Sequence, residues 1–99
     1  MGMTEDLLKI INHYGINKQL KYIHSEYFEL DEAIIEYEKA SEWTISMVEN
    51  WNRHIAEEIS DVMVMLKQIQ YYYEIPDEQI EKIMKMKIKR QLERINDEL

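Results

Sequence analysis

The chain of 99 residues contains no cysteine, a single proline and two glycines. The absence of cysteine excludes a disulfide framework and thiolate chemistry. So little proline and glycine leaves few residues suited to turns. No apolar run approaches the roughly 20 residues of a membrane span, and no signal-peptide pattern opens the chain. We therefore expect a cytoplasmic protein with no membrane partner.

Positive charge is also scarce, because 12 Lys and Arg residues face 20 Asp and Glu residues, for a net charge of −8. A net negative charge disfavours non-specific binding to nucleic acid or to an anionic membrane. We therefore expect no nucleic-acid partner. A nucleotide could still bind, but a cation would have to accompany it.

Hydrophobic residues make up 45% of the chain, which indicates a folded protein of one domain covering residues 1–99. Leu, Ile, Met, Glu and Lys dominate, so the expected class is all-α. Short connections favour antiparallel neighbours, hence an antiparallel helical bundle with four main helices. The expected helices lie between Thr4 and Gly15, from Asn17 to about Ala40, over 51–73, and from Pro76 nearly to the end. The stretch 41–50 is expected to be a connection that can be partly helical.

The second and third expected helices each carry a pair of acids at equivalent positions relative to the apolar face. A shift of 32 residues brings Glu26 onto Glu58 and Glu29 onto Asp61. In each helix the first acid falls in the apolar arc and the second about 60° to one side. A buried carboxylate is costly unless it is paired or binds a metal. If the two helices face each other, the four acids converge, and their oxygens favour Mg²⁺ or Mn²⁺ over Zn²⁺.

Two other interpretations of these acids exist. With 20 acids in the chain, pairs at this spacing are common, and most such pairs form solvated faces. A di-iron bundle would instead require Glu-x-x-His on two helices, and no histidine follows these glutamates at that spacing. His54 precedes Glu58 by one turn, where it can act as a partner of the acids or have a purely structural role.

The last expected helix supplies cations. Lys87 lies among apolar residues in the arc of that helix, Arg94 is close to the same face, and Arg90 flanks it. A basic face that complements the helix dipole accounts for Arg90 but poorly for Lys87, whose ammonium must reach water or an anion. Acids that hold a metal beside cations that hold phosphate oxygens are typical of a polyphosphate site.

These residues resemble a known family. Glu26-x-x-Glu29 followed by Glu58-x-x-Asp61, on two helices of a small all-α chain, is similar to the acidic motifs of the MazG-like nucleoside triphosphate pyrophosphohydrolases. SEYFELDEAI and AEEISDVMVML carry this similarity, and KIKRQLERI is similar to the basic tail of the family. The resemblance covers residues 16–95.

The chain also departs from the family pattern. Many members carry paired acids at the start of the first motif, where this chain has Ser25 before Glu26. The 28 residues between Glu29 and Glu58 form a long intervening segment.

The resemblance implies hydrolysis of a (d)NTP to a (d)NMP and pyrophosphate. Mg²⁺, or Mn²⁺ in its place, would activate a water for attack on the α-phosphate. It also implies homodimers or homotetramers with sites at subunit junctions, for which the aromatic residues supply interface surface. The implied roles are metal binding and catalysis for Glu26, Glu29, Glu58 and Asp61, phosphate binding for Lys87, Arg90 and Arg94, and base contact for Gln19 and Trp51.

Two alternative functions remain open from the sequence. One is a non-catalytic, oligomeric helical interaction module whose inward acids pair with Lys87 and Arg94. The other is a regulator that binds a nucleotide without cleaving it.

Overall fold

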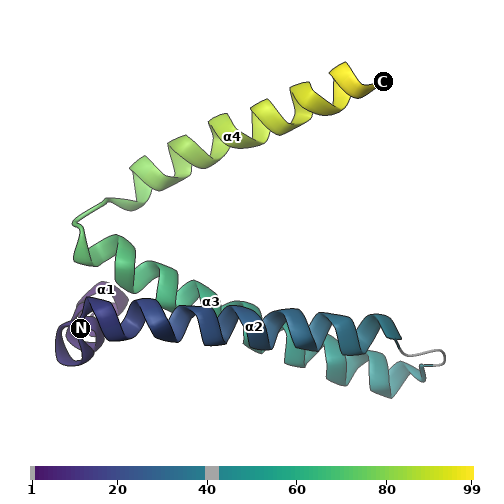
Figure 1. The fold of residues 1–99 in the computed structure, drawn as a ribbon, viewed down its shortest axis with the longest axis horizontal. Helices are drawn as coiled ribbons and strands as arrows, with labels where there is room; N and C mark the ends of the chain where they lie inside the picture. Colours follow the sequence, from purple (N-terminus) through teal and green to yellow (C-terminus); the bar gives the residue numbers. More distant parts are fainter. Residues whose placement is uncertain (1, 40–42) are drawn as a thin grey trace.

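The computed structural model describes residues 2–39 and 43–99, which form four α-helices and no strand (Figure 1). The expected all-α class is thus confirmed. The helices are α1 (Met3–Tyr14), α2 (Ile16–Lys39), α3 (Ile45–Tyr72) and α4 (Asp77–Glu98). Across the described ranges, none of these helices combines the length and the apolar character that a membrane crossing requires.

Local chemistry explains where the helices begin and end. Gly15, at φ 90°, ends α1 while its N–H donates to the carbonyl of Ile11, and α2 follows at once rather than from Asn17. The connection expected at 41–50, with room for some helix, is helical from Ile45 onward, so α3 begins earlier than the predicted start at Trp51. The hydroxyl of Thr44 accepts from the N–H of Met47 at 3.2 Å and so caps α3 six residues before the expected start. Residues 40–42 lie outside the described part.

The helices α2 and α3 lie side by side and run in opposite directions, and α1 packs across one end of this hairpin (Figure 1). The core is small. Its buried apolar residues are Leu7 and Ile11 of α1, Ala33 of α2 and Met65 of α3, joined by three buried glutamines. With so little apolar area enclosed, the three packed helices leave much of their hydrophobic surface in contact with water.

Helix α4 stands apart from the other three (Figure 1). Its backbone makes no close contact with α1, α2 or α3 in the described residues, and every residue from 81 onward is exposed. The radius of gyration is 17.2 Å, against about 13 Å for a compact domain of 100 residues. The accessible surface is 8362 Å², whereas about 6,000 Å² is typical of a compact monomer of this mass. The single chain is therefore three packed helices and one projecting helix.

A cluster of polar contacts fixes the junction between α3 and α4. The carboxylate of Asp77 accepts from Lys67 Nζ at 2.7 Å, from Gln70 Nε2 at 2.8 Å and from the Tyr71 hydroxyl at 2.9 Å. The same Gln70 amide donates to the carbonyl of Ile75 at 2.9 Å. Three donors on α3 thus hold the first residue of α4, which sets the direction in which α4 leaves the hairpin.

We expect the Asp77 cluster to stabilise the fold only above strongly acidic pH. The bond from Lys67, with those from Gln70 and Tyr71, lowers the pKa of Asp77 from 3.8 to about 2. A group with a lowered folded pKa contributes stability above its unfolded pKa and loses it as pH falls through the folded pKa. The wild type should therefore melt above Asp77→Ala at pH 5, and the difference should shrink from pH 3.8 to about 2. A difference that is the same at pH 5 and pH 2 would contradict this role.

Candidate metal centre

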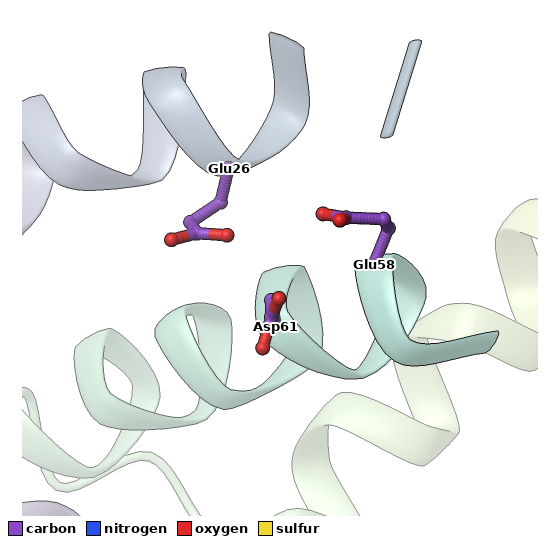
Figure 2. A group of neighbouring side chains, drawn as sticks. All are labelled: Glu26, Glu58 and Asp61. Carbon is purple, nitrogen blue, oxygen red and sulfur yellow. The ribbon is translucent and has the colours of Figure 1, made fainter. Parts of the chain in front are cut away.

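Three carboxylates converge where α2 faces α3. Glu26 extends from α2, and Glu58 and Asp61 extend from adjacent turns of α3 (Figure 2). One oxygen from each residue lies within 4.8 Å of the other two. The i, i+3 spacing of Glu58 and Asp61 puts both on the face that α3 turns toward α2. The antiparallel hairpin therefore brings together acids that are more than 30 residues apart in sequence.

Two oxygens in this cluster are buried and have no hydrogen-bond partner in the described residues, namely Glu26 Oε2 and Glu58 Oε2. The nearest basic group is His54, whose Nε2 lies 3.9 Å from Glu58 Oε1 and whose side chain is nearly half exposed. The other ion pairs of the described residues involve different acids. A buried charge without a partner is costly, so the cluster carries negative charge that the described residues leave largely uncompensated.

The electrostatics of Glu26 reflect this crowding. Burial raises its pKa above the ordinary 4.5, and repulsion from Glu29, Asp61 and Glu58 raises it further. Each of these causes disfavours the ionised carboxylate. A divalent cation in the cluster would act in the opposite direction, because its charge favours the ionised form.

We expect the contribution of Glu26 to the stability of the metal-free protein to fall as pH rises. A carboxylate with a raised folded pKa stabilises the fold below its unfolded value of 4.5 and loses that contribution as pH rises through the folded pKa. In EDTA, the Glu26→Gln variant should therefore gain thermal stability relative to wild type between pH 4 and 7. Saturating Mg²⁺ should remove this advantage. A variant advantage that shrinks as pH rises would contradict the assignment of Glu26 to an uncompensated cluster.

The fourth predicted acid, Glu29, does not join the trio. Its side chain is exposed, although its charge is close enough to raise the pKa of Glu26. Glu29 lines a hollow of about 260 Å³ beside the cluster, together with Glu58, His54 and Trp51. The structure thus places oxygens of three of the four predicted carboxylates within 4.8 Å of one another and leaves the fourth acid at the rim.

The predicted phosphate-binding cations are not near the acids in one chain. Lys87, Arg90 and Arg94 are all exposed on α4, which projects away from the hairpin (Figure 1). The position of Lys87 in the apolar arc of α4 does not bury it, because none of the helices α1, α2 and α3 covers that arc over the described ranges. In the described arrangement of one chain, these cations therefore do not reach the acid cluster.

The two predicted base contacts lie on opposite sides of the acids. Gln19 precedes Glu26 by seven residues on α2, and Trp51 precedes Glu58 by seven residues on α3. Because the helices are antiparallel, two turns, or about 10 Å, separate each of them from the acids in opposite directions. One base therefore cannot contact both. Trp51 instead packs against Trp43 and His54, with ring centroids 5.9 and 5.3 Å away.

Gln19 has a partner that sequence reasoning missed. Its Nε2 donates to Gln68 Oε1 at 2.8 Å, and both side chains are buried. The signal was present in the spacing, because Gln68 follows Asp61 by seven residues just as Gln19 precedes Glu26 by seven. The same face of the hairpin thus carries acids at one level and amides two turns away.

Comparison with family profiles, curated proteins and solved structures gives no match for this chain. The site therefore rests on its own geometry. Its donors are all carboxylate oxygens, which suits hard divalent cations such as Mg²⁺ or Mn²⁺ rather than zinc or iron. The unpartnered buried oxygens of Glu26 and Glu58 fit the same class of cation.

Proposed function

We propose that the chain is a Mg²⁺-dependent, MazG-like nucleoside triphosphate pyrophosphohydrolase that cleaves a (d)NTP to a (d)NMP and pyrophosphate. One observation carries this proposal. Glu26 and Glu58 place buried, unpartnered oxygens beside Asp61, with no Lys or Arg of the described residues in ion-pair distance of the trio. Carboxylate clusters of this kind, when loaded with divalent cations, are suited to phosphoryl chemistry.

The residues have the following proposed roles. Glu26, Glu58 and Asp61 hold the cation, and Glu29 joins them from the rim of the cluster. When bound, Mg²⁺, or Mn²⁺ in its place, supplies charge neutralisation for the triphosphate and lowers the pKa of the attacking water. One of the carboxylates accepts the proton that this water releases. The hairpin fixes the acids before substrate arrives, which favours in-line attack on the α-phosphate.

The functional unit is proposed to be a homodimer or a homotetramer built from dimers. The chain exposes roughly 2,300 Å² more than a compact monomer of its mass. That excess is the area per chain that obligate homodimers bury. A second copy that covers the apolar arc of α4 would bring Lys87 and Arg94, with Arg90 at the edge, toward the acids of its partner. Lys and Arg outnumber acids over residues 82–94 of α4, whereas acids outnumber Lys and Arg on α2 and α3, and this makes the contact electrostatically favourable.

A screen for pyrophosphate release tests the proposal. Purified protein would be incubated in Mg²⁺ or Mn²⁺ with canonical and modified NTPs and dNTPs, and pyrophosphate and monophosphate would be measured. Release of both in equal amounts, dependent on the metal, is expected. Absence of release across the panel would refute the enzyme assignment. Nucleotide binding without release would indicate the regulator instead. A cytoplasmic location is part of the proposal, because it provides triphosphates and Mg²⁺ together.

A further inference from the structure

A cavity of about 440 Å³ opens between α1, α2 and α3, two turns along the hairpin from the acid cluster. Two buried amides and a buried thioether line it, from Gln19, Gln68 and Met65, while Tyr22 is among the exposed residues of its wall. A concave site of this size with a few fixed polar groups on an apolar wall is typical of a small-molecule pocket.

The two amides hold each other in place. Gln19 is 5% exposed and Gln68 is 2% exposed, and the bond from Gln19 Nε2 to Gln68 Oε1 joins them. The remaining contact of Gln68 Nε2 is to Met65 Sδ at 3.7 Å, which is a weak acceptor. Gln19 Oε1 accepts no hydrogen bond within the described ranges. The pair lines the cavity and offers an acceptor and N–H donors to a ligand, while neither amide has a fully buried atom that lacks a partner among the described residues.

Along the α2–α3 hairpin, the buried amides, the middle of the cavity wall and the acids follow one another at intervals of one helical turn, which gives three levels. On α2, Tyr22 lies one turn from Gln19 and one turn from Glu26. On α3, Met65 has the same intermediate place between Asp61 and Gln68. Two turns separate the first and third levels, or about 10 Å, which is comparable with the span from a heterocyclic base to the phosphates of a nucleotide.

We infer that the cavity formed with Gln19, Gln68 and Tyr22 is the nucleobase subsite. The subsite binds a base that presents a hydrogen-bond donor beside an acceptor. The side-chain amides of Gln19 and Gln68 form hydrogen bonds with these two groups, and the ring of Tyr22 stacks on the base. This inference rests on the proposed function, in which the acid cluster binds the triphosphate of the same nucleotide through a divalent cation. The hollow beside Trp51 is a poorer base site, because Glu29, Glu32 and Glu36 line it and would repel an anionic ligand.

Binding of nucleosides without phosphate tests the subsite independently of catalysis. In EDTA, the side-chain amide signals of Gln19 and Gln68 would be followed by NMR while adenosine, cytidine, uridine, guanosine and their deoxy forms are added. At least one nucleoside should move both signals in a saturable manner. Tyr22→Ala should weaken that binding about tenfold, the typical effect of losing a stacked aromatic. Tyr27→Ala on the same helix, 63% exposed and outside the cavity, is the matched control and should have no effect.

A second measurement separates the subsite from the proposed function. For the nucleotide with the highest activity, Tyr22→Ala and Gln68→Leu should raise KM about tenfold and leave kcat within about twofold. Binding of Mg²⁺ with inorganic triphosphate should be unchanged in Tyr22→Ala. Tyr22→Ala, at an exposed position, decides the result if Gln68→Leu does not fold.

The outcomes distinguish the two proposals. If nucleosides move the amide signals but no pyrophosphate is released, the proposed function fails and the base pocket stands. If pyrophosphate is released, no nucleoside moves the signals and Tyr22→Ala leaves KM unchanged, the pocket is not the base subsite.

Discussion

Glu58→Gln is expected to abolish pyrophosphate release and, in the absence of metal, to raise the melting temperature. Activity should fall more than about 100-fold, because even the hydrogen-bond partners of metal ligands typically contribute 10–100-fold. Stability should rise because the change removes one of three crowded negative charges and replaces an unpartnered oxygen with an amide that can donate to Glu26 or Asp61. A gain of about 1 kcal/mol corresponds to roughly 4–8 °C in a domain of this size.

The sign of the change in melting temperature caused by Glu58→Gln distinguishes a metal site from a cluster of ion-paired acids. If the acids paired with cations, as in the interaction module, Glu58→Gln would break a buried ion pair and lower the melting temperature. Melting in EDTA and in Mg²⁺ provides the measurement, since Mg²⁺ should stabilise the wild type by mass action and leave the variant nearly unchanged. Glu49→Gln, an exposed change of the same charge on α3, controls for net charge. A variant that retains full activity would exclude Glu58 as a metal ligand.

The second large effect is expected from Ile88→Asp in α4. Apolar side chains along one side of α4, including Met84, Ile88 and Ile95, are 53–55% exposed in the single chain. If a second copy covers them, a carboxylate at position 88 is buried in the interface without a partner and costs several kcal/mol. The variant should elute as a monomer, and activity should fall because Lys87 and Arg94 no longer reach the acids of the partner.

Met86→Asp is the matched control for this experiment. Met86 is also exposed, at 65%, but lies about 160° around the helix from Ile88. It should leave both the oligomer and the activity intact. Sedimentation velocity over a range of protein concentrations gives the oligomeric state. A wild type that is monomeric at all concentrations, or an Ile88→Asp variant that assembles normally, would refute the proposed role of α4.

The parts of the structure that depend on local pattern were predictable from the sequence. Helical periodicity identified the helices, and the inward direction of Glu26 and Glu58 followed from the apolar arcs around them. The start of α3 was predicted six residues late because the stretch 41–50 has no firm hydrophobic periodicity. Without that periodicity, the sequence did not show that Thr44 caps a helix, as its hydrogen bond to Met47 does. Capping bonds of this kind depend on a single hydroxyl and leave little trace in composition.

The arrangement of helices in space was less predictable. Periodicity shows that α4 has an apolar face, but it does not show whether that face is covered by the same chain or by another. The sequence likewise placed Gln19 and Trp51 near the acids without showing that an antiparallel hairpin separates them. Gln68 was missed because a lone glutamine on a helix is ordinarily a surface residue. Each of these features depends on pairing between segments distant in sequence.

The contacts that Asp77 accepts from Lys67, Gln70 and Tyr71 have a consequence for assembly. They orient α4 before any encounter, so that in the proposed oligomer two chains would dock as preformed bodies. Little conformational entropy then remains to be lost on association, which favours tight complexes. The short loop at 73–76 would also determine the geometry of the proposed oligomer. A small change in the angle between α3 and α4 at this loop moves the far end of α4 by many ångströms.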